Sequence, residues 1–290
     1  MEERKIDMVI PYVDNTDNVW QKIFVDYCIR NNLQEKLVDL HTERYDDIGL
    51  INYQLKLINK HMPWINTIYL LLMNREQAPK DLPSNVKIVY HGAFIPQKYL
   101  PTFNSCTIEM FLWNIPTLSE YFIYANDDMI PFKDLKPSDF FTEDNKIKIE
   151  WWNEDITKCY NVFRQQCYNS YKHVATRLGK KTEQNKYIRP AHSFTPMIKS
   201  HCVQAYNLLK DIIEKHIRAF RTLYQYNQYI YPLFEYFLYG TCSSTIDFIY
   251  TQLNEEIDLD HDIVCINIVP KKKEKELIKK LEESLWVIKL

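Results

Sequence analysis

Two adjacent acidic residues, Asp127 and Asp128, follow Asn126 at the end of an apolar run over residues 121–125 and are the strongest candidates for chemistry in the chain. Carboxylates at the end of a strand can hold a hard divalent cation such as Mg²⁺ or Mn²⁺, and the cation can in turn bridge a nucleotide diphosphate. The structural alternative is an exposed polar turn without a ligand. The motif alone leaves both interpretations open.

The chain has only four glycines, which excludes two common ways of binding phosphates. A dinucleotide fingerprint and a P-loop both need glycines where the backbone approaches the phosphates. Gly179 and Lys180 are followed by Lys181 rather than by serine or threonine, and the upstream P-loop glycine is missing. Bound phosphates must therefore be held by side chains and a cation, which favours the cation interpretation of Asp127 and Asp128.

The composition is that of a globular protein: 290 residues, of which 46% are hydrophobic and 26% are charged. A net charge of −2 gives no basic field for nucleic acid, so we expect no nucleic-acid partner. Seven scattered cysteines without a C-x-x-C pair fit reduced thiols in the cytoplasm better than a disulfide framework or a zinc site. The charged first residues and the lack of an apolar run of about 18–20 residues predict neither a signal peptide nor a membrane span.

Apolar runs alternate with helical patterns in the first half of the chain. Strands are expected over residues 6–13, 68–73, 86–90 and 121–125. This alternation predicts an α/β fold with a mostly parallel sheet flanked by helices. In such sheets ligands bind at the carboxyl ends of the strands, and polar residues follow the expected strands at Asp14, Asn74, His91 and Asp127.

Helical spacing predicts the segments that connect and follow these strands. Helices are expected over residues 20–30, from Ile48 to a stop at Pro63, over 108–115, and over 203–217 with Ser200 as the N-cap. We expect one catalytic unit. Its parts are an α/β core at residues 1–145, an insertion at 146–190, and a helical part at 191–290 that completes the site.

The tail from Lys271 to Leu290 combines a lysine run with apolar residues at helical spacing. The first interpretation is a helix that packs its apolar stripe on the domain and exposes its charges to water. The alternative is peripheral contact with the anionic inner face of the cell membrane.

Several longer motifs occur in an order that resembles the Stealth family. This family comprises bacterial capsular polysaccharide phosphotransferases and the animal lysosomal-enzyme N-acetylglucosamine-1-phosphotransferase. Residues 5–14, with Asp17 and Trp20, resemble its first conserved region. The similarity to the second region lies in Arg44-Tyr45-Asp46, residues 61–65, residues 100–105 with Glu109, and residues 118–128. The third is similar to His192, Pro196-Met197, Lys199-Ser200, Phe220-Arg221 and Tyr226-Asn227, and the fourth to Cys265-Ile266-Asn267.

The resemblance implies a nucleotide-sugar transferase-like fold (GT-A or Rossmann-like) and a phosphotransferase of capsular or cell-surface polysaccharide synthesis. Such an enzyme moves a hexose-1-phosphate, for example N-acetylhexosamine-1-phosphate, from a nucleotide sugar to a glycan hydroxyl and releases a nucleoside monophosphate. We expect the donor to be UDP-linked.

The resemblance also implies roles for single residues. Asp127 and Asp128 are candidates for the metal, and Asp128 also counts as catalytic. His192 is the candidate general base, since a pKa of about 6.5 suits proton removal near neutrality. Arg221 is the candidate phosphate clamp, because its planar fork fits phosphate oxygens. The candidates for substrate binding are Asp14, Asp17, Asn104, Asn126 and Asn227.

Most of these roles have a structural alternative. Asp14 could cap the helix that begins near Trp20, and Asn104 could cap a helix from Thr107. His192 could be structural, and Arg221 could form a surface ion pair of small energetic value.

The chain also departs from the family pattern. Ile268 stands where an acidic residue usually follows, Asn52 replaces a frequent arginine, and Tyr12 and Asn15 stand for tryptophan and glycine. Two rival functions therefore stay open. One is a metal-dependent glycosyltransferase that transfers the sugar alone, and the other is a non-catalytic glycan- or nucleotide-binding paralogue.

Overall fold

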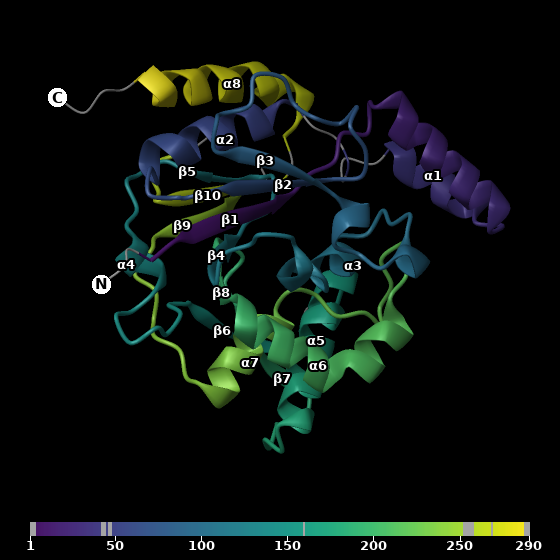
Figure 1. The fold of residues 1–290 in the computed structure, drawn as a ribbon, viewed down its shortest axis with the longest axis vertical. Coiled ribbons are helices and arrows are strands. Elements are labelled where there is room, and N and C mark those ends of the chain that lie inside the picture. The colour runs from purple at the N-terminus through teal and green to yellow at the C-terminus, as the bar shows by residue number, and fades with distance from the viewer. Residues whose placement is uncertain are drawn as a thin grey trace.

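The computed structural model describes residues 4–41, 45, 48–158, 160–251, 258–267 and 269–286. Its centre is a five-stranded sheet in the order β3-β2-β1-β4-β8 (Figure 1). The strands are β1 (Ile6–Pro11), β2 (Ile68–Leu72), β3 (Val86–Tyr90), β4 (Tyr121–Tyr124) and β8 (Thr195–Ile198). The first four run parallel, and β8 pairs antiparallel with β4 at the edge of the sheet. The predicted α/β fold with a mostly parallel sheet is confirmed.

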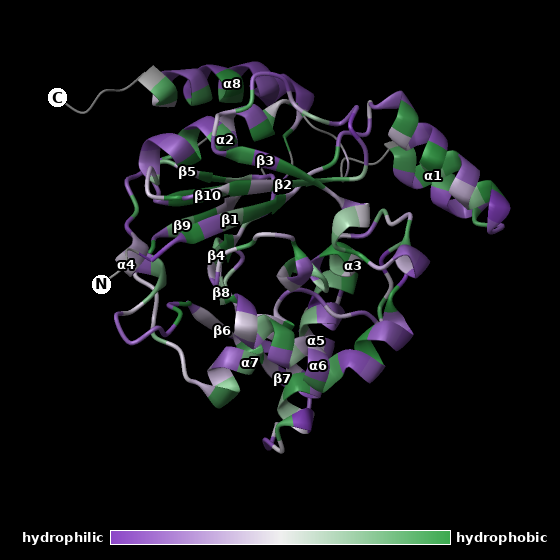
Figure 2. Cartoon of the chain, viewed as in Figure 1, coloured by the Kyte–Doolittle hydropathy of each residue, from purple (hydrophilic) through white to green (hydrophobic). Residues whose placement is uncertain are grey.

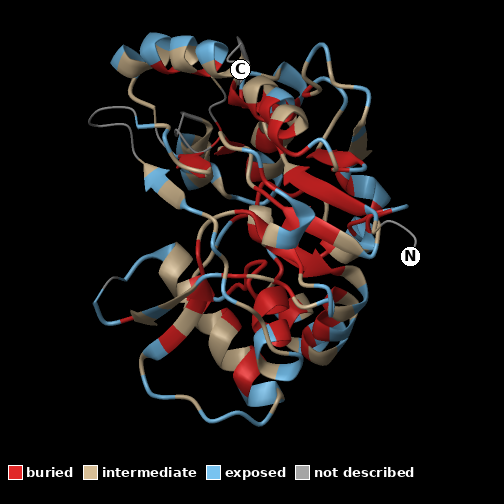
Figure 3. Cartoon of the chain, turned by 90° about the vertical axis from the view of Figure 1, so that its left-hand side faces the viewer, coloured by how far each residue is buried: buried red, intermediate tan, exposed pale blue. Residues whose placement is uncertain are grey.

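The two faces of the sheet are covered by different helices, because successive side chains of a strand point to opposite faces. Met8, Leu70 and Ile123 pack on one face against α2 (Leu50–His61). Val9 and Phe122 belong to the other core, which includes the helices α3 (Ser105–Glu109), α5 (Val162–Arg177), α6 (Lys199–His216) and α7 (Ile230–Leu238). Figure 3 shows the sheet as the buried middle layer between these helices.

Two smaller sheets adjoin the main one. A three-stranded sheet has the order β5-β10-β9, formed by β5 (Met129–Pro131), β10 (Ile263–Ile266) and β9 (Phe248–Thr251). An antiparallel pair joins β6 (Trp151–Asp155) to β7 (Lys186–Pro190), with α5 between them in the chain. The expected insertion at residues 146–190 therefore consists of a β-ribbon and a helix.

The tail forms α8 (Lys271–Trp286), which lies along α2 (Figure 1). Its Leu277 and Leu281 are fully buried in a small core with Leu57 of α2 and Val264 of β10. The outward side of α8 is hydrophilic (Figure 2). The apolar stripe thus packs on the domain, as the first interpretation of the tail predicted, and residues 287–290 lie outside the described ones.

The remaining elements are α1 (Asn18–Arg30), α4 (Pro137–Phe140) and the 3-10 turns η1 (Gln34–His41), η3 (His91–Ala93), η4 (Gln97–Tyr99) and η5 (Leu112–Asn114). Within the described residues, no helix is both long enough and apolar enough to cross a membrane.

The prediction of one helix over residues 108–115 is wrong. Helix α3 ends at Glu109 and a separate 3-10 turn follows at Leu112–Asn114. The Tyr231 hydroxyl lies 3.2 Å from the carbonyl oxygen of Glu109 and 2.8 Å from that of Met110. These are carbonyls that a continuing helix would use for its own hydrogen bonds, so a tertiary contact competes with the helical pattern.

Two expectations for the C-terminal part also differ from the structure. Ser200 does not cap α6, because the helix starts at Lys199 and the Ser200 hydroxyl bonds to Glu120 instead. The C-terminal part contains the expected helices, but it also supplies β8, β9 and β10. Strand β8 contains Pro196, which a sheet tolerates at its edge.

Candidate active site at the carboxyl edge of the sheet

From β1 the chain adds β2 and β3 on one side of the sheet and β4 on the other, so the order of the strands changes direction between β1 and β4. Open α/β sheets bind ligands at such a point, beyond the carboxyl ends of their strands. Asp14 follows β1 and Asn126, Asp127 and Asp128 follow β4, so both groups flank this point. Because β8 is antiparallel, its first residue Thr195 pairs with Tyr124, the last residue of β4. The loop that leads into β8, which carries His192, therefore reaches the same edge.

A chain of hydrogen-bonding groups links this loop to the sheet. Asn126 Nδ2 lies 3.4 Å from His192 Nε2, and His192 Nδ1 lies 3.2 Å from the Tyr229 hydroxyl. The Tyr124 hydroxyl lies 2.8 Å from Asn126 Oδ1 and 3.1 Å from Glu109 Oε1. With Asn126 presenting an N–H to Nε2, the lone pair of His192 is on Nε2 and its N–H faces Tyr229.

His192 is surrounded by groups that favour its neutral form. Burial and, to a smaller extent, the positive charges of Arg189 and Arg221 together lower the pKa of His192 to about 4. Edge contacts with Phe163 and Tyr250, at ring-centre distances of 5.6 and 5.8 Å, hold the imidazole in place. At neutral pH the ring is therefore uncharged and able to accept a proton.

Asp128 occupies a turn between two sheets. Its backbone oxygen accepts a 2.8 Å hydrogen bond from Ile266 at the end of β10, and its Oδ2 accepts one of 3.4 Å from Asn267. Its other carboxylate oxygen, Oδ1, is shut off from solvent and has no hydrogen-bond partner within the described part of the chain. Burial raises the pKa of Asp128, while hydrogen bonds from Cys265 and Asn267 oppose the shift.

These groups fit a divalent cation bound mainly by substrate. Mg²⁺ is usually held by one or two carboxylates together with phosphates and waters rather than by a complete protein cage. A buried carboxylate oxygen without a partner suits that role, and Asp127 is its neighbour in the turn. Over the described ranges, no three His, Cys, Asp or Glu side chains are grouped closely enough to hold a metal by themselves.

Arg221 lies near the same groups. Its Nη2 donates a 2.6 Å hydrogen bond to Ser105 Oγ, and its charge lowers the pKa values of His192, Asp128 and Glu109. Arg221 as a whole residue is exposed to solvent. The structure thus brings together four predicted site residues: Asn126, Asp128, His192 and Arg221.

Asp14 and Asp17 lie on the β1 side of the same edge. The Asp17 carboxylate caps α1 by accepting from the backbone N–H groups of Val19 and Trp20 at 2.9 and 3.0 Å. Asp14 instead accepts from Thr16, at 2.8 Å from its N–H and 2.7 Å from its hydroxyl. The proposed capping role of Asp14 is therefore wrong, because Asp17 is the residue that precedes the first helical turn.

Asn104 and Asn227 are enclosed in the interior. Asn104 caps α3 through Cys106, 3.1 Å away, and its amide donates to the Arg218 carbonyl at 3.0 Å and to Gln225 at 3.1 Å. Asn227 is hydrogen-bonded to Ser170 at 3.0 Å. Both side chains already have protein partners, so the alternative that Asn104 caps a helix is the arrangement seen, with the helix starting at Ser105.

The sequence did not single out every residue of the site. Tyr124, Tyr229 and Tyr250 were missed, and Glu109 was noted only as part of a motif. Tyr124 stands two residues before Asn126, a spacing that puts both side chains on one face of an extended segment. No local pattern signals Tyr229 or Tyr250, because each reaches His192 only through the tertiary fold. Arg44, Asp46 and Ile268 of the motifs lie outside the described residues.

Comparison with known proteins places these motifs in a family. Residues 44–149 match the family model described as Stealth protein CR2, conserved region 2. The capsular polysaccharide phosphotransferase of Neisseria meningitidis serogroup B is 30% identical over 225 residues, covering 73% of this chain and 58% of the relative. The capsular polysaccharide phosphotransferase cps1A of Actinobacillus pleuropneumoniae is also 30% identical over 225 residues, covering 76% of this chain and 60% of the relative.

The similarity therefore extends over part of longer proteins, since the chain covers less than two thirds of each of these relatives. Among solved structures, the galactosyltransferase LgtC in complex with donor and acceptor sugar analogues has a TM-score of 0.44 and 10% identity, with 97% of both chains covered. At this level the likeness decides neither fold nor chemistry. The family match lies on the residues that build β2, β3, α3, β4 and the Asp127-Asp128 turn, so this part of the chain is the conserved region 2 of the Stealth proteins.

Proposed function

We propose that the chain transfers a sugar 1-phosphate from a nucleotide sugar to a hydroxyl of a growing capsular or cell-surface glycan and releases a nucleoside monophosphate. The observation that carries the proposal is the placement of a neutral His192 against Asn126, the residue directly before Asp127 and Asp128. A proton acceptor thus stands beside the carboxylates that fit a diphosphate-bound cation. The names of the relatives, capsular polysaccharide phosphotransferases, support the same reaction class.

In the proposed reaction, the acceptor oxygen bonds to the phosphorus atom that carries the sugar. The bond from that phosphorus to the oxygen of the nucleoside monophosphate breaks, and the acceptor proton goes to His192 Nε2 after the acceptor hydroxyl has replaced the long 3.4 Å contact of Nε2 with Asn126. An anionic diphosphate next to the imidazole raises the pKa of His192 from its low value and so makes it a stronger base. Arg221 offers a guanidinium group for the phosphate oxygens.

Asp128 and Asp127 would hold the Mg²⁺ or Mn²⁺ ion. When bound, the ion would supply charge neutralisation on the diphosphate. Burying Asp128 as an anion costs free energy, and a nearby cation offsets that cost. The unpartnered Oδ1 of Asp128 supports this assignment.

The donor and the location are further parts of the proposal. We expect a UDP-linked donor bound on the β1 side of the edge, where Asp14 offers a carboxylate. The six described cysteines are free thiols, which fits a cytoplasmic location. The lysines of α8 face outward and would allow peripheral contact with the inner membrane surface.

Product analysis tests the reaction. The protein is incubated with a panel of nucleotide sugars, Mg²⁺ or Mn²⁺ and oligosaccharide acceptors, and the released nucleotide is identified. A nucleoside monophosphate with a new phosphodiester supports the proposal. His192→Ala should lower that rate by about 10²–10⁴-fold, the usual contribution of a general base. The variant His216→Ala, at the end of α6, is the control.

Two other results would overturn the proposal. A released nucleoside diphosphate with a glycosidic product identifies a glycosyltransferase. Donor binding without turnover, with any donor and acceptor, identifies a binding paralogue.

A further inference from the structure

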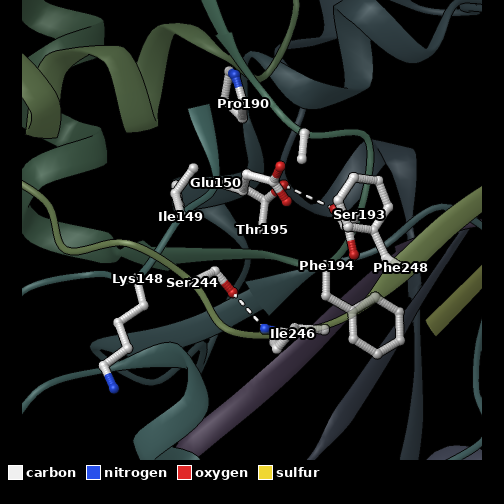
Figure 4. Close-up of a pocket in the computed structure, with 11 residues that line it drawn as sticks. Lys148, Ile149, Glu150, Pro190, Ser193, Phe194, Thr195, Ser244, Ile246 and Phe248 are labelled. Carbon is white, nitrogen blue, oxygen red and sulfur yellow. Dashed lines mark hydrogen bonds between the residues drawn. The ribbon is translucent and has the colours of Figure 1, made fainter. Parts of the chain in front are cut away.

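An open pocket lies beside the His192 loop and is not used by the proposed reaction (Figure 4). It is a shallow depression between residues 148–150, 190–195 and 244–248. The space among these residues is about 320 Å³ including open solvent, and only about 20 Å³ of it can hold the centre of a water molecule. Ala191 and Ser193 line it, whereas His192 between them contacts Asn126 and Tyr229. The pocket and the candidate base therefore lie on opposite sides of one short loop.

The segment leading into β9 connects the pocket to His192. Every second residue of it, Ser244, Ile246 and Phe248, lines the pocket. Tyr250 is next in this series, and its ring centre is 5.8 Å from that of His192. Residues two apart in a strand are about 6.6–6.8 Å apart, so one face of β9 leads directly from the pocket to the base.

The side chains around the pocket are held by Trp152. Its indole N–H donates a 2.9 Å hydrogen bond to Glu150 Oε1, and its ring stacks on Phe248 with centres 5.6 Å apart. Trp152 is itself fixed by Arg189, whose guanidinium carbon lies 4.5 Å from the Trp152 ring centre. The buried Arg189 thus holds Trp152, and Trp152 in turn positions the Glu150 carboxylate and the Phe248 ring at the pocket.

The chemistry of the lining fits a neutral sugar better than a phosphate. Glu150 supplies a carboxylate, and Ser193 and Ser244 supply hydroxyls, which together suit the hydroxyl groups of a sugar. Phe248 supplies an apolar ring for the C–H face of a sugar. A phosphate would be repelled by Glu150, and the Lys148 chain extends away from the other lining residues (Figure 4).

We propose that this pocket and the β9 face carrying Phe248 and Tyr250 bind the neutral sugar units of the acceptor glycan that adjoin the reacting hydroxyl. The inference rests on the proposed function, since it assigns the acceptor to one side of His192 and the donor to the other. The terminal hydroxyl reaches His192 past Tyr250, while the preceding sugar lies over the open side of the pocket and inserts one edge into it.

Saturation-transfer NMR on the full chain tests the binding site without turnover. The probes are maltotriose and N,N′,N″-triacetylchitotriose, with irradiation of aromatic protons. We expect saturable transfer to at least one trisaccharide, lost in Ile246→Trp, which fills the pocket. Glu150→Gln should weaken binding about tenfold, the value of one charged hydrogen bond. The control Glu143→Gln, on an exposed loop residue, should bind normally. No transfer to either probe, or equal transfer in Ile246→Trp and wild type, overturns the proposal.

Kinetics separate this inference from the proposed function. If the chain releases a nucleoside monophosphate, Glu150→Gln should raise the acceptor KM about tenfold. The donor KM, and the rate at which the nucleotide sugar is hydrolysed without an acceptor, should stay unchanged. An unchanged acceptor KM overturns the acceptor site while the phosphotransferase stands. If no nucleotide is released at all, the proposed function fails, and the NMR result still decides whether the pocket binds sugar.

Discussion

Burial lowers the pKa of His192 to about 4 and raises that of Asp128, so both groups are shifted toward their neutral forms. The two shifts have different consequences at pH 7. His192 is neutral and ready to accept a proton, whereas Asp128 carries a charge that the fold disfavours. A cation that arrives with the substrate offsets the cost of the Asp128 charge. The phosphates of the same substrate raise the basicity of His192.

The Asp128→Asn variant tests this link between stability and cation binding. In the presence of UDP as a diphosphate, we expect Mg²⁺ to raise the Tm of the wild type, since a ligand that binds only the folded state stabilises it, and to have no effect on the variant. Without Mg²⁺ the variant should be at least as stable as the wild type, because its side chain carries no buried charge. Thermal unfolding with and without Mg²⁺ measures both effects. Asp81→Asn, at an exposed position between β2 and β3, should respond to Mg²⁺ like the wild type.

His91 provides a prediction on pH. It is 5% exposed, neither ring nitrogen has a hydrogen-bond partner among the described residues, and burial lowers its pKa to about 4. The unfolded state therefore binds more protons than the folded state between about pH 4 and 6.5, and stability rises with pH across this range. His91→Leu should flatten that slope and add about 2 kcal/mol at pH 5, the cost of keeping this imidazole neutral at that pH. Urea unfolding at several pH values checks this, and an unchanged slope would show that His91 does not titrate there.

At the scale of secondary structure, the start of α1 depends on one carboxylate. Asp17 caps the helix and also accepts a 2.7 Å hydrogen bond from Asn74 at the end of β2. Asp17→Ala should lower the free energy of unfolding by about 1 kcal/mol, the usual value of an N-cap. Asp14→Ala, which removes only the contacts with Thr16, should cost less. Chemical denaturation of the two variants gives the comparison, and equal losses would argue against the cap.

Helix α8 is attached by a narrow apolar stripe. Leu281 is fully buried, so Leu281→Ala should lower the free energy of unfolding by about 2–5 kcal/mol. Lys279→Ala, on the exposed side of the same helix, should change it by less than about 0.5 kcal/mol. If Leu281→Ala instead left stability unchanged but reduced binding to anionic vesicles, the membrane interpretation of this helix would be favoured over packing.

At the scale of the whole molecule, the two halves of the chain share a hydrophobic core, in which Val9 and Tyr69 are grouped with Leu209 and Leu233. Phe103 donates a 2.9 Å backbone hydrogen bond to Ala219, Gln228 donates one of 3.0 Å to the Glu109 carboxylate, and β8 completes the main sheet. We therefore expect a single unfolding transition for residues 1–290 and no cooperative transition for the fragment 1–190. Urea titrations followed by circular dichroism test this. A fragment that unfolds cooperatively with a similar midpoint would instead identify an independent N-terminal domain.

The sequence predicted the four parallel strands well because each is a short apolar run ending at a polar residue, as at Ile68–Leu72 and Val86–Tyr90. It failed where tertiary contacts decide the structure. The helix beyond Glu109 is interrupted by the Tyr231 hydroxyl, and β8 was missed because a proline interrupts a short segment.

The same limit applies to the site. Asn126 and His192 were predicted singly, but their proximity follows from the antiparallel direction of β8, which no local pattern encodes.

The turn at Asp128 belongs to two sheets at once, and this has a consequence for how the protein is made. Strand β4 precedes the turn and β5 follows it, but β5 is paired with β10, where Cys265 stands opposite Met129. The ribosome produces β4 and β5 long before β10. A nascent chain therefore has its carboxylates before it has the strand that orients them, and the site acquires its final shape only after Ile266 and Asn267 have been added.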